Sequence, residues 1–395
     1  MNRLKTGLTA LLGSFFAFTG STHAQTAQPL NVLTTATPFL RISPDARAGG
    51  MGDIGLATSA DAASPFYNLA KTPFAKKDIG IGFTYTPWLK DLGLNDVYLL
   101  AASGYYKLSP NEAISASIRY FSLGNIQFTD YSGNEVGNGH PREMSADIGY
   151  ARKLGDKLSL AMAARYIYSN LTSGATSTSS TYKAGTSIAA DISVYYNGAT
   201  EDRGGWNFGL AVTNLGEKIG YTNVATEKDY IPADLGLGAA YTKVFDEDNK
   251  ITFGLDLHKL LVPAAPLSVD NGGSIDSANL ANYKSKPVVS SWFSSFSDGS
   301  NQLKTVQASI GAEYGYQDQF FFRTGYFYES DQSGGRKYFS VGVGLKYNVM
   351  GLNFSYLVPS GSGTTRSPLS NTLRFGLVFD LDKDDNASST PAATN

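Results

Sequence analysis

The side chains in this sequence that could carry acid and base chemistry are carboxylates inside β-like segments, and arginines stand in segments of the same kind. Two neighbouring carboxylates can act as a general acid and a general base. Carboxylates can also accept charge-assisted hydrogen bonds from arginines and line a polar interior. We favour the second use because no spacing brings a nucleophile, a base and an oxyanion donor together. The charges expected to face an interior are Arg119, Asp147, Arg165, Asp191, Asp256, Glu313, Arg323 and Arg374.

Histidines, cysteines and catalytic motifs indicate no further reactive site. Of 3 histidines, His23 lies in a segment expected to be cleaved, His140 in a long link and His258 at the end of a β-like segment. The cysteine count is 0, which excludes thiolate metal sites. We find no nucleophile elbow, zinc helix, P-loop or dinucleotide fingerprint. The sequence therefore predicts a protein that is not an enzyme and needs no metal or cofactor.

The first 24 residues have the pattern of an export signal. Arg3 and Lys5 precede an apolar run from Leu8 to Phe18, and Ala24 ends a small-residue cleavage site. The apolar run is far shorter than the roughly 20 residues that a membrane-spanning helix requires. We therefore predict a signal peptide over residues 1–24 and an exported mature chain that begins near Gln25.

Composition and charge favour a large β-protein without nucleic acid as a partner. The chain has 42 Gly, 24 Tyr and 22 Phe, which suits tightly packed strands with amphipathic rings. Its formal net charge is −2, and no run of like charge is long enough to bind a polyanion. An exported chain of 395 residues without disulfides is more consistent with an extended sheet than with a small stapled domain.

From Ile79 onward the chain repeats a segment of alternating apolar and small or polar residues followed by a turn, as membrane barrels do. Within these segments the charged residues fall on the side opposite the apolar one. This parity suits a membrane barrel, in which a cation on the lipid face costs about 2 to 4 kcal/mol at mid-bilayer. A soluble β-sandwich has the same alternation with the apolar side turned inward. The fourteen predicted strands are 79–86, 96–107, 112–121, 143–152, 158–168, 188–196, 206–213, 235–243, 251–257, 306–314, 320–329, 338–347, 352–358 and 372–379.

The lengths of the links favour the barrel over the sandwich. Short links alternate with longer ones, and outer-membrane barrels have short periplasmic turns and longer outer loops. With an even number of strands, both ends of the barrel chain then lie on the periplasmic side. We predict an all-β, 14-stranded antiparallel transmembrane β-barrel over residues 79–380 in the outer membrane of a Gram-negative bacterium. Residues 25–78 form a plug or periplasmic segment, and residues 381–395 form a disordered tail.

The longest link, from His258 to Thr305, carries apolar residues that a water-exposed loop does not ordinarily keep. They either fold back over the barrel mouth or form a surface on which another protein docks. Both alternatives remain open from sequence alone. The residues concerned are Leu260, Leu261, Val262, Pro263, Trp292, Phe293 and Phe296.

The stretch from Arg41 to Asp53, Arg-Ile-Ser-Pro-Asp-Ala-Arg-Ala-Gly-Gly-Met-Gly-Asp, resembles the N-terminal signature of the PorV family, also called LptO. Similar blocks follow in register over nearly the whole mature chain, including Leu260-Leu261-Val262-Pro263. Tyr67 stands where the family usually has Trp, and Leu69 where it has Pro, which puts the local turn in doubt. The signature gives a candidate plug motif of Arg47, Gly49, Gly50, Met51, Gly52 and Asp53.

The resemblance implies a fourteen-stranded barrel similar to the FadL fatty-acid transporters, set in outer-membrane lipid and lipopolysaccharide. It also implies that the protein binds the C-terminal signal domain of cargo at the translocon barrel (Sov or SprA) of the type IX secretion system. The cargo would then pass to the sortase-like PorU attachment complex. One alternative is a FadL-like transporter of hydrophobic small molecules, motivated by the wide barrel and its plug. An enzyme acting on lipopolysaccharide is suggested only by the family's other name.

Overall fold

The computed structural model describes residues 34–90, 93–129, 132–171, 182–223, 227–263, 266, 277–297, 305–330, 334–358 and 371–383. The predicted signal peptide, the start of the plug segment, part of the longest link and most of the predicted tail lie outside these residues. The strands are β1 (Ile79–Pro87), β2 (Val97–Ser109), β3 (Glu112–Leu123), β4 (Ile126–Thr129), β5 (Glu135–Gly139), β6 (Arg142–Lys153), β7 (Leu158–Asn170), β8 (Gly185–Asn197), β9 (Gly204–Gly216), β10 (Asp234–Val244), β11 (Asn249–Leu260), β12 (Val306–Tyr316), β13 (Phe320–Tyr328), β14 (Lys337–Tyr347), β15 (Met350–Val358) and β16 (Leu373–Leu381).

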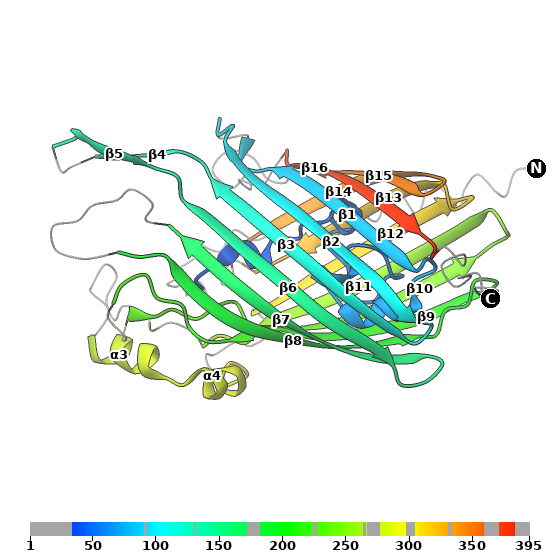
Figure 1. The fold of residues 1–395 in the computed structure, drawn as a ribbon, viewed down its shortest axis with the longest axis horizontal. Coiled ribbons are helices and arrows are strands. Elements are labelled where there is room, and N and C mark those ends of the chain that lie inside the picture. The colour runs from blue at the N-terminus through cyan, green and yellow to red at the C-terminus, as the bar shows by residue number, and fades with distance from the viewer. Residues whose placement is uncertain are drawn as a thin grey trace, which may run out of the picture. The chain divides into compact units, whose positions relative to one another are not determined.

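Fourteen of these strands form one closed antiparallel barrel, which confirms the predicted fold class. Each strand pairs with its neighbour in the chain, except that β3 pairs with β6 across the β4–β5 hairpin, and β1 pairs with β16 to close the wall. The β4–β5 hairpin continues the chain beyond the ends of β3 and β6 (Figure 1). From the sequence, residues 122–142 were predicted to be a link without strands, so this hairpin was not expected.

The direction of the side chains settles the choice between a barrel and a sandwich. Large apolar residues on alternate strand positions are exposed on the outer wall, among them Phe83, Ile148, Ile310 and Phe339. The charged residues of the same strands point inward and most are buried, as the parity predicted. A wall that exposes apolar residues all round is suited to hydrocarbon rather than water. The barrel therefore lies in the outer membrane.

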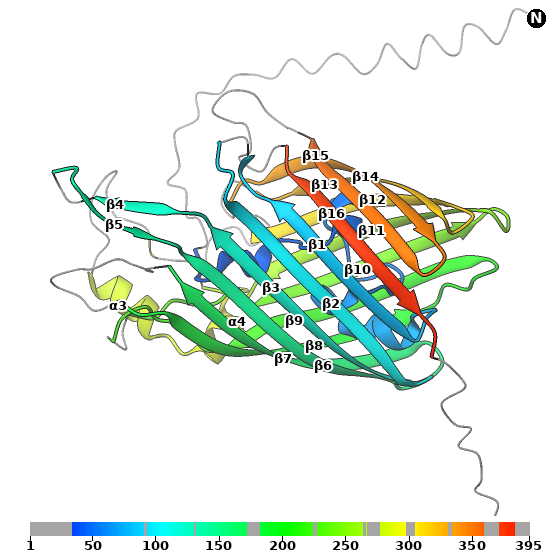
Figure 2. The same ribbon diagram turned by 45° about the horizontal axis from the view of Figure 1, so that its top comes forward.

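Long and short links lie at opposite ends of the barrel, as Figures 1 and 2 show. The short turns are tight hairpins whose residues tolerate positive φ. Gln317 and Asp318, between β12 and β13, have φ values of 55° and 54°, and Asn348, between β14 and β15, has 54°. Turns of this kind match the right-handed twist of the strands they join. The end with short turns is the periplasmic end, and the end with long links is the extracellular end.

Helical segments that precede β1 lie within the barrel (Figure 2). They are the short helices η1 (Pro38–Arg41), α2 (Ala46–Gly50), η2 (Ser64–Phe66) and η3 (Leu69–Phe74). Phe39, Met51, Ile54 and Leu56 of this part are buried. We call residues 34–78 the plug. Among the described residues, no helix has the length and apolarity needed to span a bilayer.

Candidate functional site

The plug motif begins with α2, a helix that lies against the barrel wall. Asp45 caps its N-terminus by accepting a hydrogen bond from the backbone N–H of Ala48 at 2.8 Å. A Cβ on Gly49 would stand 2.1 Å from Nη1 of Arg374, and a Cβ on Gly50 would stand 3.0 Å from Cα of Gly342. A side chain at Gly50 would crowd the backbone of β14, so glycine favours the close approach of α2 to this strand.

After α2 the plug backbone turns directly against the wall. Gly52 has a φ of +70°, which a side chain would strain. Met51 lies so close to the wall that a Cβ on Gly325 would be 2.1 Å from its carbonyl carbon, and one on Gly311 would be 2.3 Å from its oxygen. The backbone N–H of Gly52 donates to Oγ of Ser340 at 2.8 Å. Glycines in the plug motif and in β12 and β13 therefore allow the two backbones to approach each other closely.

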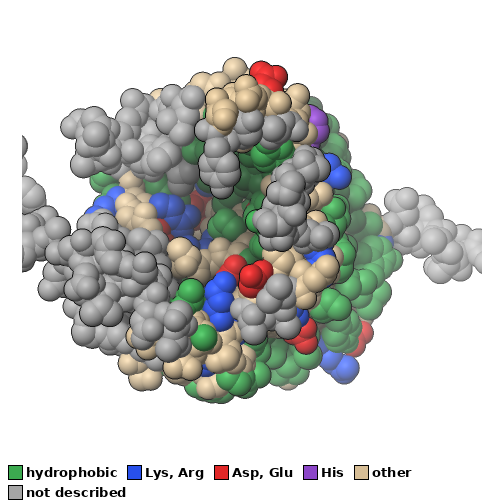
Figure 3. Space-filling model, turned by 90° about the vertical axis from the view of Figure 1, so that its left-hand side faces the viewer, with side chains coloured by type: hydrophobic (Ala, Val, Ile, Leu, Met, Phe, Trp, Pro, Cys, Tyr) green, Lys and Arg blue, Asp and Glu red, His purple; other side chains and the backbone are tan. Residues whose placement is uncertain are grey.

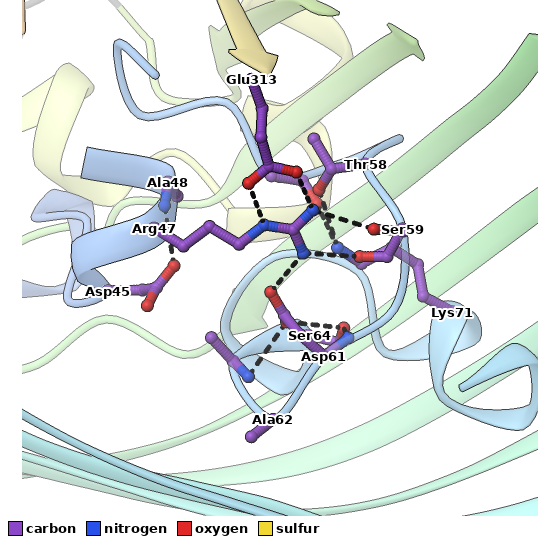
Figure 4. A network of polar contacts seen from close by, with 12 residues as sticks. Asp45, Arg47, Ala48, Thr58, Ser59, Asp61, Ala62, Ser64, Lys71 and Glu313 are labelled. Atoms are coloured by element: carbon purple, nitrogen blue, oxygen red, sulfur yellow. Dashed lines mark hydrogen bonds and ion pairs between the residues drawn. The ribbon is translucent and has the colours of Figure 1, made fainter. Parts of the chain in front are cut away.

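Arg47 joins the plug to the wall through a network of charged groups (Figure 4). Its guanidinium donates to both oxygens of Glu313 on β12, from Nε at 2.9 Å and from Nη2 at 2.8 Å. It also donates to Asp61 at 2.7 Å and to the side chain of Ser59 at 2.8 Å. Arg323 on β13 donates to the same carboxylate of Glu313 at 2.7 Å. Glu313 is thus held between two arginines, one from the plug and one from the wall.

Asp53 makes a second charged link at the other end of the motif. Its carboxylate accepts a hydrogen bond from Nη1 of the buried Arg374 on β16 at 2.8 Å, and another from the hydroxyl of Tyr338 on β14. The two links, at Arg47 and Asp53, lie on either side of the glycine-rich turn. They fix both ends of the plug motif to different strands.

Further hydrogen bonds attach the plug to other strands of the barrel. Asp256 on β11 accepts from the backbone N–H groups of Gly55 at 2.7 Å and Leu56 at 2.9 Å. The side chain of Asn68 donates to the carbonyl of Val194 on β8 at 3.0 Å. Arg119 on β3 donates to the carbonyl of Leu40 at 2.9 Å. The plug is therefore bonded to strands around the barrel rather than hinged on one side.

Two titratable groups inside the plug have displaced pKa values because they are buried. Burial lowers the pKa of Lys71 to about 8, although the carboxylate of Asp61 opposes this shift. Its ammonium donates to the carbonyl of Gly55 at 2.7 Å. Burial raises the pKa of the Tyr67 hydroxyl well above its ordinary value. Both groups have structural roles, since the Lys71 ammonium donates within the plug and the Tyr67 hydroxyl shares a hydrogen bond with the hydroxyl of Ser43.

The remaining lumen charges form a cluster around Arg165 on β7. Arg165 donates to Asp147, to Asn214 and, at 2.8 Å, to Asp191. Asp191 also accepts from the backbone N–H of Asn214 at 2.7 Å, at the point where the register between β8 and β9 shifts. The structure thus brings these carboxylates to an arginine and not into an acid–base pair. No group of three His, Cys, Asp or Glu that could hold a metal occurs in the described ranges.

Some of these partners could have been found from sequence. Asp147 stands directly opposite Arg165 across β6 and β7, and Glu313 stands opposite Arg323 across β12 and β13. Both pairs are symmetric about their hairpin turns, so a turn position and strand parity suffice to match them. The partners that come from the plug, Arg47 and Asp53, have no such signal.

The residues predicted for a docking loop divide into two groups. Leu260, Leu261, Val262 and Pro263 are buried at the end of β11, where the backbone N–H of Leu261 donates to the carbonyl of Ala233 at 2.7 Å. The four side chains are therefore not exposed at the end of β11. Trp292 is half-buried, whereas the side chains of Phe293 and Phe296 are exposed.

Trp292 and Phe293 lie on a helix that was not predicted from the sequence, and Phe296 follows the end of that helix. The longest link contains α3 (Ser277–Ser285) and α4 (Val288–Ser294). Lys218, from the link between β9 and β10, donates to the carbonyls of Lys284 at 2.7 Å and Lys286 at 2.8 Å, where α3 gives way to α4. The hydroxyl of Tyr230 donates to the carbonyl of Tyr283 at 3.1 Å. Pro287 immediately before an apolar pattern with helical spacing was the available signal for α4.

The extracellular end presents charged side chains in a hollow, and apolar side chains gather on one flank of the barrel (Figure 3). At this end His258 on β11 contacts Asp234 on β10 at 2.6 Å, and His140 contacts Asn125. Each histidine therefore has a neighbouring hydrogen-bond partner within the rim.

The family model described as Type IX secretion system protein PorV matches residues 24–267. Among solved structures, the Ralstonia pickettii toluene transporter TbuX has 12% identity and a TM-score of 0.50, with 85% of this chain and 97% of that chain covered. A Pseudomonas aeruginosa FadL homologue has 11% identity and a TM-score of 0.44, with 89% and 100% covered. Comparison with curated proteins found no sequence match.

The likeness to TbuX supports the fold and nothing more, since the identity is low. The family match covers more than half of the chain and includes the whole plug motif. The matched residues include the glycine-rich turn of the plug and strands β1 to β11 of the wall. The chain belongs to the PorV family of the type IX secretion system, as an outer-membrane β-barrel.

Proposed function

We propose that this chain is a non-catalytic adaptor that binds the C-terminal signal domain of cargo as it leaves the translocon barrel (Sov or SprA). It then delivers the cargo to the sortase-like PorU attachment complex. The observation that carries this proposal is the match of residues 24–267 to the PorV family. Cargo, translocon and attachment complex are the partners that this role requires.

The many bonds between the plug and the barrel wall support an adaptor over a transporter. The plug is bonded to β3, β8, β11, β12 and β16, and two of these bonds are ion pairs, one of the partly buried Arg47 and one of the buried Arg374. Removing one partner from such a pair leaves an uncompensated buried charge. Opening the lumen for a solute would require several of these bonds to break together. The accessible surface for a partner is therefore the extracellular end.

Docking of cargo is assigned to the extracellular end formed by the β4–β5 hairpin and the longest link. The buried group Leu260 to Pro263 anchors the base of this link, so it is retained in the test. Residues 266–304 would be replaced by a short Gly-Ser linker. Cargo display on the cell surface is expected to fall at least tenfold while the barrel still assembles, as judged by its heat-dependent electrophoretic mobility.

A matched control replaces the periplasmic turn Asp246 to Asp248 by Gly and Ser residues, which alters the opposite end of the barrel. This variant is expected to display cargo normally. A second assay uses purified barrels in lipid nanodiscs and measures binding of an isolated cargo signal domain. Unchanged display and unchanged binding by the linker variant would contradict the assignment of docking to the longest link.

A FadL-like transporter of hydrophobic small molecules is the second candidate. It is motivated by the barrel fold, which this chain shares with the toluene transporter TbuX. Transport requires a path through or around the plug, whereas an adaptor does not. Uptake of a labelled apolar solute in cells that have and lack the protein separates the two functions.

A further inference from the structure

Helix α4 and the turn that follows it expose three large apolar side chains. Val289, Phe293 and Phe296 recur at helical spacing, and their exposed fractions are 57%, 74% and 50%. Ser291 and Ser295 lie on the opposite side and are buried. A helix on a water-exposed surface has the reverse arrangement, with its apolar side turned to the protein. We call Val289, Phe293 and Phe296 the α4 stripe.

The α4 stripe adjoins the lipid-facing surface of the barrel wall. The ring of Phe296 lies 5.4 Å from Nζ of Lys259. Lys259 occupies the same outward row of β11 as Phe253, Leu255 and Leu257, at the extracellular end of that row. In Figure 1 α4 lies below the lower edge of the wall. The stripe therefore begins where the apolar band of β11 ends.

The composition around the α4 stripe is that of a segment at a membrane surface. Residues 277–297 contain Lys284 and Lys286 but no Asp or Glu. Lys284 also contacts Asp229 at 3.6 Å, so part of its charge is balanced. Trp292 adds a ring with a polar N–H beside the stripe. Tryptophan and lysine next to exposed phenylalanines are typical of helices that lie in the headgroup region.

We infer that α4 is an interfacial helix, with the α4 stripe inserted among the acyl chains of the outer leaflet and Lys284 and Lys286 near the lipid phosphates. Continuity with the lipid-facing row of β11 favours lipid as the occupant over a soluble protein domain. The inference goes beyond the proposed function, since it requires no cargo. It gives the longest extracellular link a second attachment, to the membrane surface, in addition to its bonds with Lys218 and Tyr230.

The absence of cysteine from the chain allows a direct test by single-site spin labelling. Phe293→Cys is labelled in the full mature barrel, reconstituted in liposomes that contain anionic lipid and no other protein. Ile310→Cys on the outer wall serves as the lipid reference, and Asn282→Cys on α3 as the water reference. Collisions of the label with oxygen and with a water-soluble nickel chelate are compared at each site.

At position 293 the label is expected to favour oxygen over the nickel chelate at least threefold, as at 310, with the opposite preference at 282. Val289→Cys repeats the measurement with both phenylalanines intact. A label at 289 and 293 that behaves like the one at 282 would overturn the inference and return the α4 stripe to protein docking. Because cargo is absent, this result is independent of the test of the proposed function.

Discussion

Arg47 in the plug and Glu313 in the wall are joined by two hydrogen bonds, at 2.9 Å and 2.8 Å, although they stand 266 residues apart in the chain. Burial alone would lower the pKa of Arg47, but the carboxylates of Glu313 and Asp61 hold it well above the ordinary value. The arginine is therefore charged in the folded protein at any pH of interest. The pair makes the position of the plug depend on charge complementarity with β12.

Replacing Glu313 by Gln is expected to loosen the plug. The amide keeps the shape of the side chain but leaves Arg47 and Arg323 without their shared negative partner. Breaking a buried ion pair in this way costs about 3 to 5 kcal/mol. The expected result is faster proteolysis of the plug in the purified barrel and a lower midpoint of thermal unfolding.

Asp318→Asn is the matched control, since Asp318 pairs with Lys250 and Lys76 in an exposed turn at the periplasmic end. Exposed pairs contribute about 0 to 1 kcal/mol. Equal effects of Glu313→Gln and Asp318→Asn would show that the Arg47 contact does not hold the plug.

An arginine on the outer wall should impair assembly according to its depth in the bilayer. Ile148, in the middle of β6, is 69% exposed, and Tyr347, at the periplasmic end of β14, is 80% exposed. Arginine costs about 2 to 4 kcal/mol at the midplane and 0 to 1 near the interface. Ile148→Arg is thus expected to reduce the yield of folded barrel in lipid vesicles far more than Tyr347→Arg. Similar yields would argue against a lipid-facing outer wall.

A disulfide can test whether function requires the plug to leave the wall. The Cβ of Ala46 lies 3.3 Å from an ideal Cβ built at Gly376, which is near the separation found in disulfides. In the cysteine-free chain, Ala46→Cys with Gly376→Cys therefore tethers α2 to β16. The oxidised protein is expected to bind a cargo signal domain with unchanged affinity. Binding that is lost on oxidation and restored on reduction would show that plug movement is part of the function.

Lys71 predicts a rise in stability on the alkaline side of neutrality. Its folded pKa is about 8, below the ordinary lysine value of about 10.4. Between these values the unfolded chain binds a proton that the folded chain does not, so the free energy of unfolding increases with pH. The full difference is on the order of 3 kcal/mol.

The contribution of Lys71 to stability is measured between pH 8 and pH 10. It is the unfolding free energy of the parent protein minus that of the Lys71→Met variant. Subtraction removes the contribution of other groups that titrate in this range. The difference should grow with pH, because methionine has no proton to lose. A difference that stays constant or shrinks would mean that the Lys71 ammonium is not destabilised in the plug.

The barrel was predictable because each strand carries its own information. Alternation in a strand such as β14 identifies its two faces, and the charge of Lys346 marks the inner one without reference to any other strand. Strand ends were less certain: β8 begins at Gly185, three residues before the predicted start, since glycine and threonine give no clear alternation. The β4–β5 hairpin was missed because four- and five-residue strands are too short to show a period.

The attachment of the plug could not be predicted by the same reasoning. Asp53 and Arg374 meet only because α2 lies inside a closed barrel, and neither strand parity nor hairpin symmetry relates them. The exposure of the apolar side chains of α4 could not be predicted either, because an apolar pattern does not reveal which side of a helix faces the protein. Long-range contacts of this kind depend on the three-dimensional path of the chain, and only the structure supplies it.

Strand β16 both completes the wall, by pairing with β1, and carries Arg374, which holds Asp53. Closure of the barrel and attachment of the plug therefore depend on the same strand, so the two steps are coupled during assembly. A polypeptide truncated before Leu373 would have neither the β1–β16 pairing nor the contact between Arg374 and Asp53. Insertion into the bilayer is in this way linked to the arrival of a complete C-terminus.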